Sequence, residues 1–349
     1  MDRRFSVRGV LKTHGIPRAL IAFALFIVVY IIFGIINPMV FSPANIINLL
    51  RAMSIYLLVG IGQSYVMITG NIDLSIGSIV GLSSIVSWTL MYRKIYVAGQ
   101  SFIPAGVPAS YAVLITLVCC LAVGLINGFL VGRFKLPASI ATLGTMYLAR
   151  GVAHMVNNNR SGDAIAGGIG KEAADKFQDF FYYGKTYGIY NTFLIAMAIF
   201  IGFFFLLSKT KTGRHIYAVG SNTEAAKLSG VNVQVTIIKT YLVSSFAACV
   251  VGLMLVAQAT MGNMEAGNGY EIYGVAAGVI GGISPLGGAG NLLGTLAGAA
   301  VWQTLQNGLS MVGAQVGIQR IVIGAITIVA VLLDVLLRNR KIRRYATTN

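Results

Sequence analysis

Charged side chains are scarce in this sequence. Asp, Glu, Lys and Arg together make up 10% of its 349 residues, whereas soluble domains carry about 25%. The chain is 56% hydrophobic and has a mean hydropathy of +0.78. So few charges cannot cover the surface of such a chain in water, so lipid must be the solvent for much of it. The sequence therefore predicts an all-α membrane protein.

Cysteine and histidine are also rare, and neither residue type has the spacing of a disulfide framework or a metal site. Cys119, Cys120 and Cys249 lie in apolar runs, where free cysteines act as small hydrophobic residues. The three histidines are scattered, and no pair has the spacing of a metal site. We expect neither a disulfide nor a metal ion. The clustered side chains that a membrane-embedded enzyme would need are not visible either.

The sequence also lacks the phosphate-binding loop that an ATPase needs, G-x-x-x-x-G-K-[ST]. Its nearest counterpart is DFFYYGKT, in which Asp179 takes the place of the first glycine. We therefore predict a non-catalytic chain that holds no cofactor of its own.

Long apolar runs dominate what is present. Nine are long enough to cross a bilayer as helices, and a shorter tenth, at 272–285, fits a broken or partial span. We predict one transmembrane domain over residues 1–349, with about ten helices, some of them short or broken. The nine longer runs lie at about 19–37, 46–69, 75–92, 111–132, 137–156, 190–208, 233–259, 291–312 and 319–337.

Basic residues are unevenly divided between the connecting segments. Ten spans place both termini on the same side of the membrane. If that side is the cytoplasm, the cytoplasmic segments hold 16 Lys and Arg residues and the outside loops hold 6, as the positive-inside rule requires. This bias explains the net charge of +16 without nucleic acid. The predicted topology has cytoplasmic tails at 1–18 and 338–349, a cytoplasmic loop at 209–232 and an extracytoplasmic loop at 157–189. In the latter, KEAADKFQDFF is typical of a short amphipathic helix.

The loop at 209–232 contains a short helix with signals at both ends. In SNTEAAKLSG, Asn222 is a good N-cap, Glu224 suits the helix dipole, and Gly230 can take the left-handed position after the helix. We expect Ala225 and Ala226 to be exposed, so that another protein could approach closely. A helix that merely connects two spans is the alternative.

This loop resembles the cytoplasmic coupling loop of ABC-transporter permeases for ribose, galactose and related monosaccharides. The pattern T-x-x-G-R-x-I-Y-A-x-G-x-N-x-x-A-A-x-x-S-G-[IV]-N-V is matched from Thr210 to Val233. The resemblance implies that the coupling contacts with an ATPase are made by Gly213, Arg214, Asn222, Glu224, Ala225, Ala226, Lys227, Leu228, Ser229 and Gly230.

The resemblance extends along most of the chain. GNIDLSIGSIVGL (70–82), SIATLGTMYLARGV (139–152) and GVIGGISPLGGAGNLLGTLAGA (278–299) are similar to further segments of the same family. It implies a type II-like ABC importer permease of the bacterial inner membrane. The partners it implies are a cytoplasmic ATPase that uses ATP and Mg²⁺, an extracytoplasmic sugar-binding protein and a second permease copy, identical or related. One departure is Tyr273, where the family often has Asp, and it leaves the identity of the sugar open.

Polar residues interrupt several spans, and such residues usually face a bundle interior or a watery cavity. Because amides and hydroxyls bind sugars, these residues are candidates for the translocation pathway, with hydrogen bonding between helices as the alternative. The candidates are Asp73, Ser75, Asn127, Thr142, Arg150, Glu271, Gln303, Gln306 and Asn307.

Two of these regions allow two interpretations. In NIDLSIG, Asp73 either caps the next span in a tight cytoplasmic turn or belongs to a broken helix near the pathway. The Gly-rich stretch GVIGGISPLGGAGNLLG favours close helix packing and a tight turn around Pro285 over a substrate site.

Two other functions compete with the ABC importer. An ion-coupled secondary transporter would need ionisable residues deep in the membrane, and the sequence offers few. The second is a permease for another small polar solute, such as a branched-chain amino acid. Only the family resemblance favours a sugar over such a solute.

Overall fold

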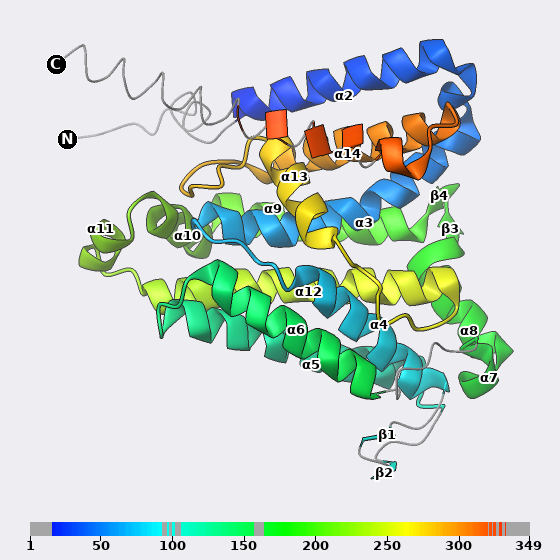
Figure 1. The fold of residues 1–349 in the computed structure, drawn as a ribbon, viewed down its shortest axis with the longest axis horizontal. Coiled ribbons are helices and arrows are strands. Elements are labelled where there is room, and N and C mark those ends of the chain that lie inside the picture. The colour runs from blue at the N-terminus through cyan, green and yellow to red at the C-terminus, as the bar shows by residue number, and fades with distance from the viewer. Residues whose placement is uncertain are drawn as a thin grey trace.

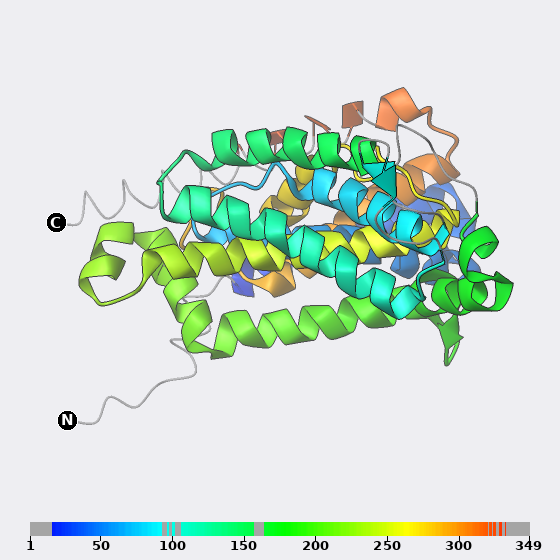
Figure 2. The ribbon, with the colours of Figure 1, turned by 90° about the horizontal axis from the view of Figure 1, so that it is seen from below.

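The computed structural model describes residues 16–92, 96–97, 100–101, 106–156, 164–319, 321–322, 324–325, 328–329 and 332. Long helices run roughly side by side along one axis of the molecule (Figures 1 and 2). By length and composition, five described helices can cross a membrane. They are α2 (Ile16–Ile36), α3 (Pro43–Ile68), α5 (Ala109–Gly132), α9 (Asn191–Lys209) and α12 (Val233–Ala259).

Helices also occupy four of the other predicted positions: α4 (Ile76–Tyr92), α6 (Ala138–Val156), α13 (Tyr270–Ile280) and α14 (Leu292–Met311). The prediction of an all-α fold with some short helices is confirmed. The last predicted span, 319–337, lies largely outside the described residues, as does the tail 338–349. Of the tail 1–18, only residues from Ile16 onward are described.

Helix α12 forms the centre of the core. It packs against α3, α4 and α5, and most of its side chains are buried. Cys249 of α12 and Cys120 of α5 are free, buried thiols, as expected for small core residues. The outer helices α2, α5 and α9 instead expose many large apolar side chains, which suits contact with lipid.

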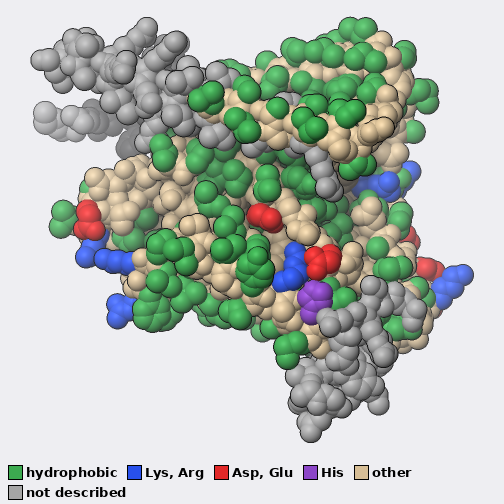
Figure 3. All heavy atoms as spheres, viewed as in Figure 1, with side chains coloured by type: hydrophobic (Ala, Val, Ile, Leu, Met, Phe, Trp, Pro, Cys, Tyr) green, Lys and Arg blue, Asp and Glu red, His purple; other side chains and the backbone are tan. Residues whose placement is uncertain are grey.

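The two ends of the bundle carry different small elements. One end holds α10 (Lys211–Ser221) and α11 (Thr223–Leu228), and we call it the α11 end. The opposite end, the α8 end, holds α7 (Ala166–Ile169), α8 (Lys171–Gln178), the π-helix η2 (Asp179–Tyr183) and the hairpin β3–β4 (Lys185–Thr186 and Ile189–Tyr190). On the face shown in Figure 3, most Lys and Arg side chains gather at these ends. Two further small elements are the 3-10 helix η1 (Pro38–Phe41) and the hairpin β1–β2 (Tyr96–Val97 and Gln100–Ser101).

The predicted amphipathic helix is present at the α8 end, because Ala174 and Phe177 of α8 are buried while its charged side chains are exposed. Cation–π contacts connect the α8 end to α3. The Arg51 guanidinium of α3 lies 4.1 Å from the ring centre of Tyr190 and 4.9 Å from that of Tyr182. Burial raises the pKa of the Tyr182 hydroxyl, although the Arg51 charge opposes that shift.

Irregular backbone enters the bundle at two places. After α3 reaches the α11 end, residues 69–75 return into the interior, where α4 begins. After α12 reaches the α8 end, residues 260–269 return in the same way to the start of α13 (Figure 1). Both α4 and α13 therefore begin inside the molecule. Such breaks are tolerated at membrane depth only where protein or water satisfies the backbone.

Candidate functional site

Three consecutive caps shape the segment at the α11 end. The Thr210 side chain caps α10, Asn222 accepts a hydrogen bond from the Ala225 N–H at 2.9 Å to cap α11, and Asn232 caps α12. The helix predicted from SNTEAAKLSG is thus confirmed. The sequence reasoning missed α10, whose mixed basic and apolar composition did not stand out as a helix.

The C-terminus of α11 has the geometry of a Schellman motif. Gly230 has a φ of +81°, as predicted, and its N–H donates to the Lys227 carbonyl at 3.0 Å. The Val231 N–H donates to the Ala226 carbonyl at 3.0 Å. These bonds end the helix sharply and turn the chain toward α12.

The expectation of an exposed alanine pair is wrong for one of the two residues. Ala226 is 4% exposed and packs in a cluster with Val219, Val131 and Ile237. Ala226 is the residue of α11 that faces the bundle, while its neighbours Ala225 and Lys227 are exposed. Ala225 faces outward, and Leu228 is 89% exposed. The apolar contact that α11 offers is therefore Leu228.

Two glycines hold α10 against the bundle. A Cβ on Gly220 would overlap the Ile68 carbonyl oxygen at the end of α3, and one on Gly213 would overlap the Leu207 carbonyl oxygen of α9. Arg214, a predicted coupling residue, is exposed on the same helix. Motion of the α11 end would therefore reach α3 and α9 directly.

The first irregular segment is held by a buried polar network. Asp73 is 1% exposed, and its carboxylate accepts bonds from the Ser75 N–H at 2.9 Å, the Ser75 hydroxyl at 2.6 Å and the Ser244 hydroxyl at 2.7 Å. Because Ser244 lies near the middle of α12, Asp73 does not sit in a cytoplasmic turn. The interpretation of NIDLSIG as a tight cytoplasmic turn is therefore wrong. Asp73 nevertheless accepts a hydrogen bond from the Ser75 N–H just before α4, as a cap would.

Other helices complete this network. Asn127 of α5 donates to the Ser75 hydroxyl at 2.8 Å and accepts from Thr145 of α6 at 2.5 Å. The Thr142 hydroxyl accepts from the Leu74 N–H at 3.1 Å. The network therefore brings together four predicted pathway residues, Asp73, Ser75, Asn127 and Thr142. Their hydrogen bonds pair polar groups of the irregular segment before α4.

Sequence reasoning missed three members of this network, Ser244, Thr145 and Gln63. With its nitrogen turned toward the Asp73 carbonyl, the Gln63 amide of α3 pairs with both backbone groups of Asp73 at 3.2 and 3.3 Å. Gln63 interrupts an apolar run in the same way as the residues that were selected, so the same signal could have found it.

The second irregular segment meets the first near the start of α4. Arg150 of α6 donates from Nη1 to the carbonyls of Met264 and, at 3.1 Å, Ala266. A Cβ on Gly77 of α4 would overlap the Gly267 carbonyl and lie 2.5 Å from the Glu271 carboxylate. The predicted residue Arg150 thus ties this segment to α6, and the predicted residue Glu271 lies close to the first turn of α4.

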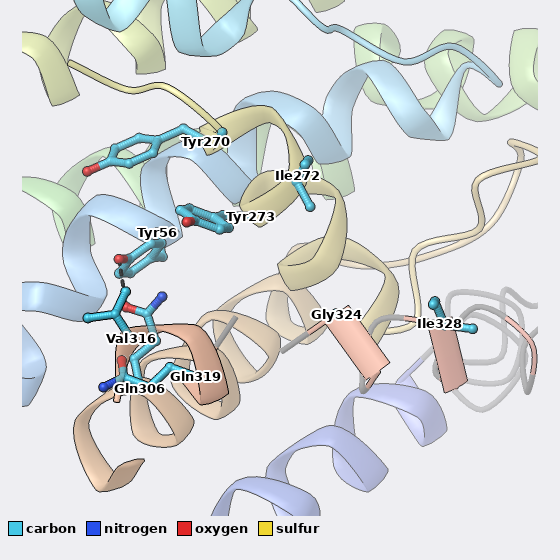
Figure 4. A pocket seen from close by; sticks show the side chains of 10 residues that line it. Tyr56, Tyr270, Ile272, Tyr273, Gln306, Val316, Gln319, Gly324 and Ile328 are labelled. Atoms are coloured by element: carbon cyan, nitrogen blue, oxygen red, sulfur yellow. Dashed lines mark hydrogen bonds between the residues drawn. The ribbon is translucent and has the colours of Figure 1, made fainter. Parts of the chain in front are cut away.

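A cavity of about 660 Å³ opens beside α13. The Tyr56 hydroxyl donates to Gln306 at 2.9 Å across it, and Tyr270 and Tyr273 lie beside Tyr56 (Figure 4). All of its described lining residues are uncharged. They are Tyr56, Gly269, Tyr270, Ile272, Tyr273, Gln306, Val316, Gln319, Gly324 and Ile328.

The other predicted pathway residues of α14 lie outside this cavity. Asn307 exchanges two hydrogen bonds with Asn45 of α3, at 3.0 and 3.1 Å, which is the helix-to-helix alternative. Gln303 is 7% exposed, and its Oε1 has no partner among the described residues. Of the residues predicted on α14, only Gln306 reaches the cavity.

The Gly-rich stretch is a packing element, as predicted. A Cβ on Gly281 would overlap the backbone of Gly294, and a Cβ on Gly298 would overlap the Ala277 carbonyl. The turn between α13 and α14 contains Gly287 and Gly288 at positive φ. No cluster of three His, Cys, Asp or Glu side chains that could hold a metal ion occurs within the described residues.

Known proteins match this chain along most of its length. Residues 45–331 match the family described as branched-chain amino acid transport system / permease component. The ribose import permease protein RbsC of Escherichia coli (strain K12) is 33% identical over 308 residues, covering 88% of this chain and 91% of that protein. RbsC of Bacillus subtilis (strain 168) is 34% identical over 322 residues, covering 92% and 94%.

The galactose/methyl galactoside import permease protein MglC of Escherichia coli (strain K12) is 31% identical over 323 residues, covering 91% of this chain and 95% of that protein. No solved structure matches the chain.

Proposed function

This chain belongs to the permease family that its residues 45–331 match, and from this premise we propose that it is the membrane-spanning subunit of an ABC importer for a monosaccharide. The relatives named above are import permeases for ribose and for galactose. The observation that carries the sugar assignment is the cavity beside α13, whose described lining is uncharged and includes three tyrosines and two glutamines. A neutral, hydroxyl-rich solute suits such a lining better than a zwitterionic amino acid, whose charges would be left without partners.

The coupling role falls to the α11 end. Leu228 and Ala225 project from a short helix that is capped at both ends and anchored to α3 through α10. A cytoplasmic ATPase that closes on nucleotide binding would hold these side chains in a groove. The permease pair would then shift between its states because one state makes better contacts with the closed ATPase.

The partners and topology follow from this assignment. Two permease copies, identical or related, would enclose one pathway, and an extracytoplasmic binding protein would deliver the sugar at the α8 end. Both termini and the α11 end would lie in the cytoplasm, which agrees with the basic residues Lys209, Lys211, Arg214 and Lys227 there. In this arrangement the chain is one transmembrane domain in the bacterial inner membrane.

Labelling from one side of the membrane tests the topology. Lys227→Cys and Lys185→Cys each place a thiol at an exposed position, at the α11 and α8 ends respectively. In intact cells, a membrane-impermeant maleimide should label only the cysteine at 185, and both after lysis. Labelling of both in intact cells would overturn the topology.

Reconstituted transport tests the function. The permease, purified together with its ATPase and sealed in vesicles with the binding protein, should take up radiolabelled ribose or galactose only when ATP is supplied to the ATPase. Uptake driven by an ion gradient without ATP would instead support a secondary transporter. ATP-driven uptake of leucine without either sugar would overturn the substrate assignment.

A further inference from the structure

The cavity beside α13 is open on one side, since its lining residues Ile272, Val316 and Ile328 are 57%, 64% and 70% exposed, and it reaches the middle of α3. Tyr56 is at the middle of α3, and Tyr270 and Tyr273 are in the first turn of α13, which begins where residues 260–269 have returned into the interior (Figure 1). Binding sites of transporters are commonly built at the ends of such interrupted helices near mid-membrane. The position therefore suits a solute in transit.

Three aromatic rings pack against one another there at tilted angles. The ring centres of Tyr56 and Tyr273 are 5.7 Å apart at 66°, those of Tyr56 and Tyr270 6.1 Å apart at 43°, and those of Tyr270 and Tyr273 5.6 Å apart at 42°. All three side chains keep some exposure. Rings that only fill a core would be fully buried, so this residual exposure leaves part of the cluster accessible to a ligand.

Polar groups occupy one side of this cavity. In Figure 4 the tyrosine hydroxyls and the amides of Gln306 and Gln319 lie on one side, together with Val316, and Ile272, Gly324 and Ile328 lie on the other. Hydroxyls and amides both donate and accept hydrogen bonds. A ligand with one apolar face and a rim of hydroxyls fits this division, and so does the volume of about 660 Å³, since small-ligand pockets span about 300–1,000 Å³.

The wall behind Tyr273 has an unused polar group. Trp302 is fully buried with its ring centre 5.1 Å from that of Tyr273, and its indole N–H has no partner among the described residues. Buried donors are normally paired. A ligand that shifts Tyr273, or a water that enters with it, could supply that partner.

We infer that the sugar binds transiently at Tyr56, Tyr270, Tyr273 and Gln306 while it crosses the membrane. The C–H face of its pyranose or furanose ring packs on a tyrosine, and its hydroxyls form hydrogen bonds with the amides. This inference rests on the proposed function, which it extends to named residues. The described lining residues offer few polar groups and no charge, so we expect weak binding. A transport pathway needs such weakness, since a solute must also leave.

The test separates transport from ATP hydrolysis in the reconstituted complex. Tyr273→Leu should lower ribose or galactose uptake per ATP hydrolysed by about 3- to 10-fold, because it removes one aromatic contact. Tyr273→Phe keeps the ring and should stay within about 2-fold of the unaltered protein. Tyr147→Leu is the matched control, since Tyr147 is a 69% exposed tyrosine on α6 outside the cavity, and it should have no effect.

Each other outcome has a distinct meaning. Uptake per ATP that Tyr273→Leu leaves unchanged would overturn the inference alone. An equal fall in uptake, ATP hydrolysis and recovered complex would show that the tyrosine only holds the bundle together, and would also overturn it. If the unaltered complex transports neither ribose nor galactose with ATP, the proposed function fails, and this inference with it.

Discussion

The Tyr217 hydroxyl on α10 donates a hydrogen bond to the Gly290 carbonyl, 2.8 Å away. Gly290 belongs to the turn between α13 and α14, and the Gly288 N–H of the same turn donates to the Ile68 carbonyl at 2.8 Å. The α11 end is therefore connected through one short path to α3 and to α13. Both helices line the tyrosine cavity, so a displacement of α11 has a direct mechanical route to it.

Replacing Tyr217 with phenylalanine tests this route. Tyr217→Phe removes one partly buried hydrogen bond, which contributes about 1 kcal/mol. We expect sugar uptake per ATP hydrolysed to fall several-fold while the ATPase still copurifies in normal amount. Tyr187→Phe, at a fully exposed tyrosine of the α8 end, is the control. Unchanged transport by Tyr217→Phe would show that coupling does not pass through the Gly290 contact.

Leu228 should be the main apolar contact with the ATPase. Leu228→Ser alters a side chain that is 89% exposed, so the stability of the permease alone should change by no more than about 0.5 kcal/mol. A leucine buried at an interface contributes about 1.5–3 kcal/mol, so its loss should reduce copurified ATPase at least tenfold. Val312→Ser, at a 40% exposed valine beyond α14, should have no such effect. Normal ATPase recovery with Leu228→Ser would remove Leu228 from the interface.

A bulky residue at Ala226 should act differently, because this side chain faces its own bundle. Ala226→Trp would overpack the cluster around Val219 and Ile237, at a cost of at least about 1–3 kcal/mol. We expect a lower melting temperature of the permease by itself, before any partner is added. An unaltered melting temperature would indicate that α11 can move away from the bundle.

Removal of the Ser244 hydroxyl should weaken the broken span. Ser244→Ala leaves one Asp73 carboxylate oxygen without its donor, and such a loss in a buried site costs about 1–3 kcal/mol. The buried thiols of Cys120 and Cys249 can report unfolding through a thiol-reactive dye. Ser208→Ala, at an exposed serine of α9, is the control and should melt like the unaltered protein. Equal melting of both variants would contradict the role given to the network.

The helices and the caps of α11 were predictable because both depend on local sequence. A long apolar run indicates a span wherever it later packs, and Asn222 and Gly230 act on backbone groups within a few residues of themselves. The side of α11 that faces the bundle was not predictable. It depends on where Val131 and Ile237, from two other helices, meet Ala226.

The same distinction holds for the two polar sites. Polar interruptions of apolar runs pointed to Asp73, Asn127 and Gln306, but the sequence could not say that the first two meet and that the third lies elsewhere. Tyr56 carried no signal, because an aromatic residue within an apolar run is typical of a core. Only the return of residues 260–269 into the bundle brings Tyr270 and Tyr273 beside it.

Gly220 gives the sharpest test of the contact between α10 and α3. A Cβ at this position would overlap the Ile68 carbonyl oxygen and lie 2.7 Å from the Gly288 nitrogen. Both neighbours are backbone atoms, which cannot rotate away, so Gly220→Ala must push α10 from the end of α3. In an open helix the same change is favourable by about 0.5–1 kcal/mol, because alanine has less backbone entropy to lose than glycine. Gly202→Ala in α9 is that open case, since nothing lies within 4 Å of the added Cβ. We expect Gly202→Ala to melt at or above the temperature of the unaltered protein, and Gly220→Ala to melt lower and to transport less sugar per ATP. If both variants gained stability, α10 would not be held as closely to α3 as the structure shows, and the mechanical route from α11 to the tyrosine cavity would lose its first step.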